Sequence, residues 1–241
     1  MAPHRGTVAF EHPDRIPRGP ERDNEAMTKS VAHPERINRF AEQWVHGWAI
    51  ARSTPAPVRV PHGYRLDVGL PGHRTRHVLT DPGPVARLSR ILTAPDTWLK
   101  VCGPREAAVS TLDPRWRVGE TEYLMTVELS PDPVPAPDHY TVKVTESHRC
   151  FQARAWSATG TEAASSIMAL HAGTAVFDRV VTDPDHRRRG LGRALMNTLG
   201  RAAFDQGAEH GLLVATDDGR GLYERLGWEL VCPVTPARLM G

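Results

Sequence analysis

One stretch of the sequence, residues 176–203, constrains the fold more than any other. It begins with a run rich in Val and Phe that ends at Asp183-Pro184, a composition typical of a strand bounded by a turn. From Leu191 onward, apolar residues recur at three- and four-residue spacing, which predicts a helix over about residues 191–206. Between strand and helix lie three arginines and two glycines: Arg187, Arg188, Arg189, Gly190 and Gly192. Because the first turn of a helix has unpaired backbone N–H groups, this arrangement predicts an anion-binding loop.

The loop reads Arg187-x-x-Gly190-x-Gly192, so it is neither Gly-x-Gly-x-x-Gly nor a Gly-Lys-Ser/Thr nucleotide loop. Alone, it could be an ordinary solvated basic turn. A second block follows about thirty residues later: a predicted strand at 211–216, then Leu222-Tyr223 and Gly227-Trp228 in the pattern Leu-Tyr-x-x-x-Gly-aromatic. The two ordered blocks resemble the pyrophosphate loop and the following helix of the GNAT superfamily, the GCN5-related N-acetyltransferases. The resemblance covers about residues 139–234.

The resemblance implies acetyl-CoA as co-substrate and assigns residues to it. Backbone N–H groups of the loop would bind the pyrophosphate, with arginine side chains adding positive charge, and the end of the preceding strand would line the pantetheine arm. The family's phenolic hydroxyl beside the CoA sulfur corresponds to Tyr223, which would act as general acid and also contact the cofactor. The remaining cofactor residues that the resemblance implies are Val180, Val181, Thr182, Arg187, Arg188, Arg189, Gly190, Leu191, Gly192, Arg193, Thr216 and Gly219.

Asp178 stands out from the residues themselves. It lies in mid-strand among Val and Phe, where burying an acid is costly unless it is paired or functional. Period-two alternation predicts one shared face for Val176, Asp178, Val180 and Thr182. We therefore expect Asp178 to be the general base or the anchor of the acceptor's ammonium group. The alternative is a structural ion pair with an arginine such as Arg179 or Arg154. Further candidates for the base are Glu122, Glu146, His171 and a water chain.

Composition narrows the function classes. The chain has 241 residues and a net charge of +2, with no long acidic or basic run and no apolar run long enough for a membrane span. We expect no nucleic-acid partner and no membrane partner. The N-terminus has no signal peptide, and the three cysteines form no pair motif, so we expect a cytoplasmic protein. The 12 histidines show no metal-ligand spacing, and we expect no metal.

The chain divides into four predicted segments. Residues 1–32 have few apolar anchors and are expected to be disordered. Residues 33–129 predict a smaller α/β unit in β-β-α-β-α-β order after an opening helix, either a unit of its own or a degenerate copy of the GNAT half. Residues 130–138 contain four prolines and predict a linker. Residues 139–241 are expected to form the GNAT-like acetyl-CoA-binding domain, with four strands ahead of the basic loop and a last strand at 228–234. The fold class is therefore α/β, an α+β mixed sheet.

Two departures from the family pattern concern the acceptor. The family usually places two helices between its first and second strands, but the chain has no room for them between residues 146 and 150. It also ends too soon after residue 234 for the usual final strand. The acceptor wall must come from elsewhere. We expect the N-terminal half to supply it, through the predicted helix at 34–52 with Trp44 and Trp48 on its apolar face. The alternatives are that both tryptophans only pack the core, or that the partner subunit of a homodimer supplies the wall.

These expectations combine into one function. We predict an acetyl-CoA-dependent N-acetyltransferase that transfers the acetyl group directly to a primary amine of a small molecule in a ternary complex. No cysteine lies in the matching motifs, so an acyl-cysteine route has no support. Two alternatives stay open: a protein lysine or N-terminal acetyltransferase, and a non-catalytic acyl-CoA-binding sensor.

Overall fold

The computed structural model describes residues 33–130 and 135–240. The segment expected to be disordered, 1–32, and residues 131–134 of the expected linker lie outside the described residues. In chain order the elements are α1 (Pro34–Ala51), β1 (Val58–Val60), β2 (Gly63–Leu70), β3 (His73–Leu79), α2 (Val85–Ile91), β4 (Thr97–Cys102), α3 (Arg105–Val109), β5 (Trp116–Val118), β6 (Glu122–Glu128), β7 (Tyr140–Ser147), β8 (Cys150–Ser157), β9 (Glu162–His171), β10 (Thr174–Thr182), the 3-10 turn η2 (Pro184–His186), α4 (Leu191–Asp205), β11 (His210–Ala215), α5 (Asp217–Arg225) and β12 (Glu229–Leu239).

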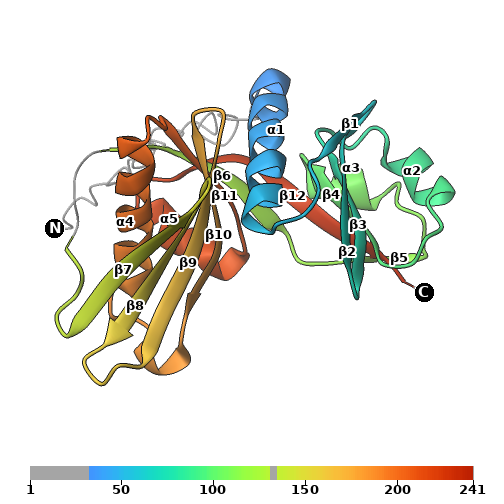
Figure 1. Ribbon diagram of the computed structural model, residues 1–241. Coiled ribbons are helices and arrows are strands. Elements are labelled where there is room, and N and C mark those ends of the chain that lie inside the picture. Colours follow the sequence, from blue (N-terminus) through green and yellow to red (C-terminus); the bar gives the residue numbers. More distant parts are fainter. Residues whose placement is uncertain (1–32, 131–134, 241) are drawn as a thin grey trace, which may run out of the picture. The chain divides into compact units, whose positions relative to one another are not determined.

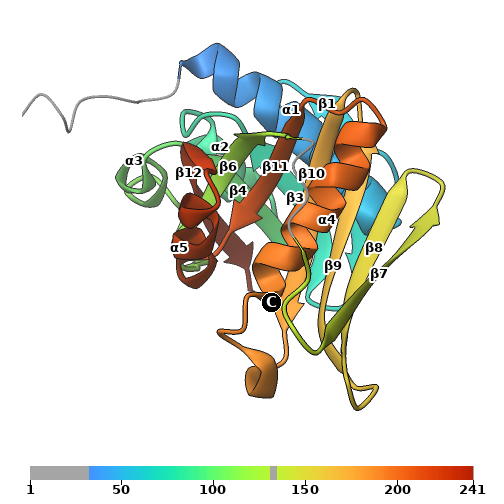
Figure 2. The same ribbon diagram turned by 90° about the vertical axis from the view of Figure 1, so that its left-hand side faces the viewer.

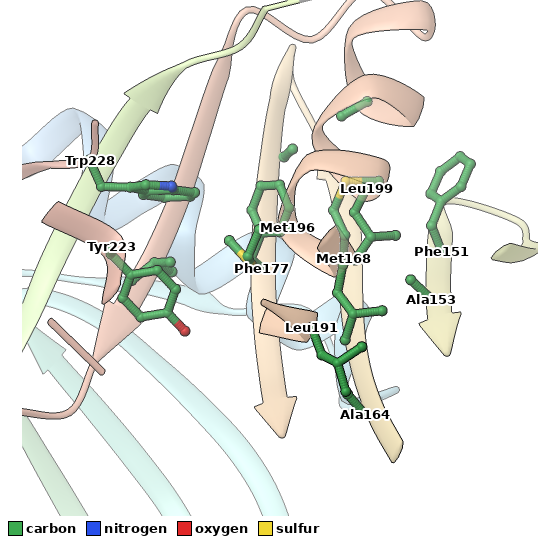
Figure 3. Packing of buried hydrophobic residues seen from close by; sticks show 14 of the residues in the cluster. Phe151, Ala153, Ala164, Met168, Phe177, Leu191, Met196, Leu199, Tyr223 and Trp228 are labelled. Carbon is green, nitrogen blue, oxygen red and sulfur yellow. The ribbon is translucent and has the colours of Figure 1, made fainter. Parts of the chain in front are cut away.

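All strands of the described residues join one mixed sheet in the order β1-β2-β3-β4-β12-β6-β11-β10-β9-β8-β7, with β5 beside β12. Helix α4 packs on β7 to β10, whereas α1 contacts β9 and β10 and also β2 (Figures 1 and 2). Along β10, Val176 packs in the cluster under α1 and Phe177 in the cluster under α4, so the two helices cover opposite faces. Figure 3 shows the cluster under α4, where leucines of the helix meet Met168 and Phe177. The expected mixed α/β class is confirmed.

Helix α1 forms because Pro34 suits the first helical turn and an apolar stripe follows at helical spacing. Trp44 and Trp48 of this stripe are buried, with 3 % and 6 % of their surface exposed. Gly47 allows the helix to approach the sheet closely, because a Cβ at this position would lie 2.2 Å from Cγ2 of Val176. The N-terminal helix is thereby fixed against the strand that precedes the basic loop.

The two halves of the chain alternate in the centre of the sheet. β6 of the N-terminal half lies between β11 and β12 and is antiparallel to both. β12 of the C-terminal half lies between β6 and β4 and is antiparallel to β4 over residues 234–238. The expected end of the last strand near residue 234 is therefore wrong, since β12 continues to Leu239. The expected linker falls between β6 and β7, and the strands on its two sides share one sheet.

The halves also repeat one another in topology. In the N-terminal half, the hairpin β2–β3 leads through α2 to β4, which is parallel to β3. In the C-terminal half, the hairpin β9–β10 leads through α4 to β11, which is parallel to β10. A short helix follows in each half, leading to β5 and β6 in the N-terminal half and to β12 in the C-terminal half. β6 and β12 each pair with the other half's βαβ unit. This order supports the interpretation of the N-terminal half as a degenerate copy.

Strand β10 departs from the predicted alternation. Its pairing with β9 shifts by one residue between Asp178 and Val181, and Arg179 has a left-handed φ of 51°. Such a bulge moves the following side chains to the other face. The predicted shared face is therefore wrong for Val180 and Thr182. Val180 packs into the cluster under α4, and Thr182 pairs with Ala164 of that cluster.

Between residues 33 and 240, outside the gap at 131–134, no helix is long and apolar enough to cross a bilayer.

Candidate active site

The parallel strands β10 and β11 separate part-way along their length. They pair only from Thr174 to Val176, although β10 continues beside β9 to Thr182 and β11 continues beside β6 to Ala215. Two cavities lie where these strands part, and Thr216 lines both of them. We call the larger one, about 570 Å³, the groove and the smaller one, about 160 Å³, the pocket. Ligands of α/β sheets commonly bind in such a crevice at the carboxyl ends of parallel strands.

The groove brings together most of the residues that the sequence assigned to the cofactor. Its lining consists of Val180, Val181, Thr182, Arg187, Arg188, Gly190, Leu191, Gly192, Arg193, Thr216, Asp218, Gly219, Leu222 and Arg225. Two assigned residues, Arg189 and Tyr223, are not part of this lining. Asp218, Leu222 and Arg225 were not predicted. All three belong to α5, and their place beside the basic loop depends on contacts between residues far apart in the chain.

The loop ahead of α4 is shaped for an anion. Gly190 is the N-cap of α4 in the left-handed region, with φ 79°, and no side chain caps the first turn. Arg188 is also left-handed, with φ 59°. Backbone N–H groups in such alternating conformations form anion-binding concavities. At Gly192 an added Cβ would lie 3.1 Å from Leu222, so glycine keeps this wall of the groove clear. These residues fit the pyrophosphate of CoA.

The three arginines of the loop make different contacts. Arg187 and Arg188 line the groove, together with Arg193 of α4. The guanidinium of Arg189 instead donates to the hydroxyl of Tyr140 and to the carbonyl of Asp185, at 3.0 Å each. The Arg189 side chain therefore braces the loop against β7, which leaves only its backbone for the predicted contact with the pyrophosphate.

The pocket lies between α1 and the sheet, on the other side of Thr216 from the groove. It is lined by Trp44, Trp48, Arg52, Arg76, Lys100, Glu122, Phe177, Asp178, Val214 and Thr216. The predicted acceptor residues Trp44, Trp48 and Asp178 thus come together, and both halves of the chain contribute. Of the further candidates for the base, only Glu122 reaches the pocket. Glu146 is exposed on β7, and His171 stacks on His46 with ring centroids 4.5 Å apart.

Asp178 forms an ion pair, but not with a predicted partner. Both of its carboxylate oxygens accept from Arg52 at the end of α1, with 3.0 Å between Oδ1 and Nη2. Arg154, one expected partner, pairs with Glu162 instead, with 3.8 Å between Nε of Arg154 and Oε2 of Glu162. The sequence could not show this pairing, because the residues of the pair lie 126 positions apart.

Three pocket cations were missed: Arg52, Arg76 and Lys100. Lys100 is nearly enclosed and donates to Glu122, with 2.6 Å between Nζ and Oε1. Burial lowers the pKa of Lys100 to about 8, although the charge of Glu122 opposes this shift. The signal that singled out Asp178, a charge in mid-strand among apolar residues, applies equally to Lys100 in Thr97–Cys102 and could have identified it.

Tyr223 lies behind the groove wall. Its ring is tilted against Trp228, with centroids 5.9 Å apart (Figure 3), and its Cε2 would lie 3.2 Å from a Cβ at Gly219. Burial, and secondarily the charge of Asp178, raises the pKa of Tyr223 to about 12. The phenol therefore keeps its proton at neutral pH. Thr216 sets the start of α5, because its hydroxyl accepts from the N–H of Gly219 at 3.3 Å.

The described residues contain no group of three or more His, Cys, Asp and Glu side chains that could hold a metal ion. The two cavities are thus lined by side chains that bind anions, cations and apolar surface.

Comparison with known proteins identifies the domain around the groove. Residues 148–230 match the family model of the acetyltransferase (GNAT) domain. No curated protein matches the chain. Among solved structures, a GCN5-related N-acetyltransferase from Kribbella flavida aligns with a TM-score of 0.61 at 19% identity, covering 85% of this chain and 96% of that one. A putative GNAT-family acetyltransferase from Novosphingobium aromaticivorans aligns with a TM-score of 0.54 at 19% identity, covering 87% and 100%. At this identity the likeness concerns the fold, and it extends over both halves of the chain. By its sequence match and its fold, the chain carries a GNAT acetyltransferase domain.

Proposed function

We propose that the protein is an acetyl-CoA-dependent N-acetyltransferase that acts on a primary amine of a small molecule. One observation supports this most: a basic groove with an uncapped helix N-terminus and a charged pocket share Thr216, where β10 and β11 part. The groove suits the phosphates of a nucleotide-like donor, and the pocket suits a polar acceptor. Acetyl-CoA, when bound, supplies a thioester that an amine can attack.

The residues around the junction have distinct tasks in this proposal. The N–H groups at the start of α4 and the side chains of Arg187 and Arg188 hold the pyrophosphate. Beyond Val176, β10 no longer pairs with β11, which leaves main-chain groups of β10 available to the pantetheine arm. Asp178 faces the acceptor's ammonium group as its anchor or base. Tyr223 holds a proton for the departing thiolate.

Direct transfer is favoured over an acyl-cysteine route. None of the three cysteines, all of which lie within the described residues, lines the groove or the pocket. A hydrogen bond with Cys232, together with burial, raises the pKa of Cys102 well above its usual value, and burial raises that of Cys150. Since the thiolate is the nucleophilic form, these thiols are poorly suited to attack a thioester.

The pocket's size favours a small acceptor over a protein. At about 160 Å³ it is smaller than the roughly 300–1,000 Å³ of sites for drug-sized ligands. The C-terminal half has no helix between β7 and β8, where the resembled family usually has two, and α1 packs against β9 and β10. Because α1 belongs to the same chain, the proposal needs no second subunit to complete the wall.

The test is release of CoA thiol from acetyl-CoA in the presence of small amines or of lysine-containing and N-terminal peptides. We expect turnover with a small primary amine and the acetylated amine as product. Asp178→Asn should lower kcat/KM by about 10- to 100-fold, the value of one charge-assisted hydrogen bond. Asp67→Asn, in a surface ion pair with Arg65, is the matched control and should leave it unchanged.

The alternatives give different results in the same assay. Acetylation of peptides without acetylation of small amines would establish the protein acetyltransferase instead. Tight binding of acetyl-CoA without thiol release for any amine or peptide would establish the sensor. Either outcome contradicts the proposal.

A further inference from the structure

Arg76 of β3 occupies the pocket without an ion pair of its own. Its guanidinium carbon lies 4.1 Å from the centroid of the Trp48 ring, and its Nε donates to Nε2 of His73 at 3.2 Å. A guanidinium is planar, and stacking on an aromatic ring fixes its orientation. Two of its N–H groups can then donate to the two oxygens of one carboxylate. Arg76 thus has the geometry of a carboxylate-binding residue.

The charged groups of the pocket leave the positive charge of Arg76 without a matching carboxylate. The other two cations of the pocket are matched, Arg52 by Asp178 and Lys100 by Glu122. Within residues 33–130 and 135–240, no carboxylate forms a salt bridge with Arg76. Glu122 and Asp178 act on it only at longer range. The pocket therefore carries one positive charge more than its own carboxylates neutralise.

Burial makes this excess costly. It lowers the pKa of Arg76 to about 10, so the guanidinium is still charged at neutral pH. His73 adds no charge to the pocket, because burial and the neighbouring arginine lower its pKa to about 4 and leave the ring neutral. A buried charge without a partner is strongly unfavourable, and a bound anion would relieve that cost. The pocket shares Thr216 with the groove, so an anion bound in it would lie next to the donor site.

We propose that the acceptor is a small amine that also carries a carboxylate, as an amino acid does, and that Arg76 binds this carboxylate. The inference rests on the proposed acetyltransferase function and names its substrate class. Asp178 lines the same pocket and meets the ammonium end, so the two charged ends of one small molecule find opposite partners. Trp44 and Trp48 supply apolar surface for the atoms between them.

The experiment uses the full-length protein, acetyl-CoA and three matched sets of acceptors: the twenty common amino acids, their carboxamides and their decarboxylated amines. Thiol release gives kcat and KM for each. We expect at least one amino acid to exceed its carboxamide and its decarboxylated amine by about 10- to 100-fold in kcat/KM, the value of a charge-assisted two-point contact. A set of amine monophosphates is included to test the kind of anion.

Variants then assign the preference to Arg76. Arg76→Gln should raise the KM for the preferred amino acid by about 10- to 100-fold and remove the preference over the carboxamide. Arg76→Lys, which keeps the charge but not the fork, should retain part of the preference. Arg74→Gln, an exposed arginine on the same strand, is the control and should leave KM unchanged. Circular dichroism and a thermal unfolding midpoint like those of the wild type show that Arg76→Gln is folded.

The outcomes separate the two proposals. Equal or better turnover of carboxamides or decarboxylated amines by the wild-type protein overturns the carboxylate inference and leaves the acetyltransferase function intact. Preference for amine monophosphates, or an unchanged preference in Arg76→Gln, also overturns it. Absence of turnover with every amine while acetyl-CoA binds overturns the proposed function, and this inference with it.

Discussion

In the first βαβ unit of the sheet, β3 and β4 pair in parallel from Thr75 to the end of β3 at Leu79. In the second unit, β10 and β11 stop pairing at Val176, six residues before β10 ends. The connections are the same, so topology alone does not create the crevice. Beyond Val176, β10 stays beside β9, where it bulges at Arg179, and β11 stays beside β6. A crevice for a ligand thus depends on where two parallel strands stop pairing and not on how they are connected.

The loops of the two units differ in chemistry as well. The loop ahead of α2 contains Asp81, whose carboxylate accepts the N–H of Gly83 at 2.8 Å, and Pro84 is the N-cap of a seven-residue helix. The loop ahead of the 15-residue α4 has three arginines and a left-handed glycine with no side-chain cap. An acid repels a pyrophosphate and already uses one of the available donors. We therefore assign acetyl-CoA to the second unit alone, while the first unit contributes Arg76 and Lys100 to the acceptor pocket.

The largest expected effect distinguishes the helices that follow the two units. α5 carries Tyr223, whereas α3 has no tyrosine. Tyr223→Phe should lower kcat by about 10²- to 10⁴-fold, the usual contribution of a positioned general acid. Affinity for acetyl-CoA should stay within about two-fold, since phenylalanine keeps the ring that packs against Trp228. Thiol release and calorimetry measure the two quantities. Tyr123→Phe, which removes a hydroxyl bonded to Asp217, is the control. Unchanged kcat would remove Tyr223 from the mechanism.

The next effect concerns the ion pair between Lys100 of β4 and Glu122 of β6, the two strands that flank β12. Lys100→Met leaves Glu122 without its buried partner and should cost about 2–3 kcal/mol of unfolding free energy, reduced from the fully buried case because Glu122 is partly exposed. The double variant Lys100→Met with Glu122→Gln should recover most of this loss, because no buried charge remains unpaired. Urea denaturation measures both. A double variant as unstable as the single one would show that the loss comes from packing.

Glycine substitutions compare the basic loop with an ordinary turn. Gly190 has φ 79° and Gly173, in the β9–β10 hairpin, has φ 72°. Alanine at either position should cost about 1–2 kcal/mol of stability, the strain of a left-handed residue with a Cβ. Only Gly190→Ala should also weaken acetyl-CoA, by about ten-fold. Equal effects of both variants on binding would contradict the assignment of the loop to the pyrophosphate.

The smallest effect concerns His73, a partly buried residue of β3 in the first unit. Burial, with nearby arginines, lowers the pKa of His73 to about 4 from its ordinary 6.5. Between these values the unfolded chain binds a proton that the folded chain resists, so stability falls as pH drops from 6.5 toward 4. Between pH 7 and pH 5, the wild type should lose about 1 kcal/mol more than His73→Gln, a modest value because the ring is only partly buried. The exposed His33→Gln should behave like the wild type. Equal losses in wild type and His73→Gln would contradict a desolvated His73.

Local sequence patterns predicted the helices and strands well because each has a clear apolar period and clear turns, as at Pro34 for α1 and Asp183-Pro184 after β10. The alternation of β6 and β12 in the sheet could not be predicted, since strand order depends on contacts far apart in the chain. The same holds for the Arg52–Asp178 pair. The bulge at Arg179 could not be predicted, because the strand contains no glycine or proline near it. The bulge moves Val180 and Thr182 to the face opposite the predicted one. The site residues predicted best are those on one continuous stretch, from Val180 to Arg193.

The most direct test of the difference between the two units is a calorimetric titration of the full-length protein with acetyl-CoA. We predict one molecule bound per chain. Arg188→Glu in the second unit should weaken binding by at least about ten-fold, by replacing an attractive charge with a repulsive one, while Arg87→Glu, the same change on exposed α2 of the first unit, should leave it unaffected. Two molecules per chain, or binding weakened by Arg87→Glu and not by Arg188→Glu, would contradict the assignment of the donor site to the second unit.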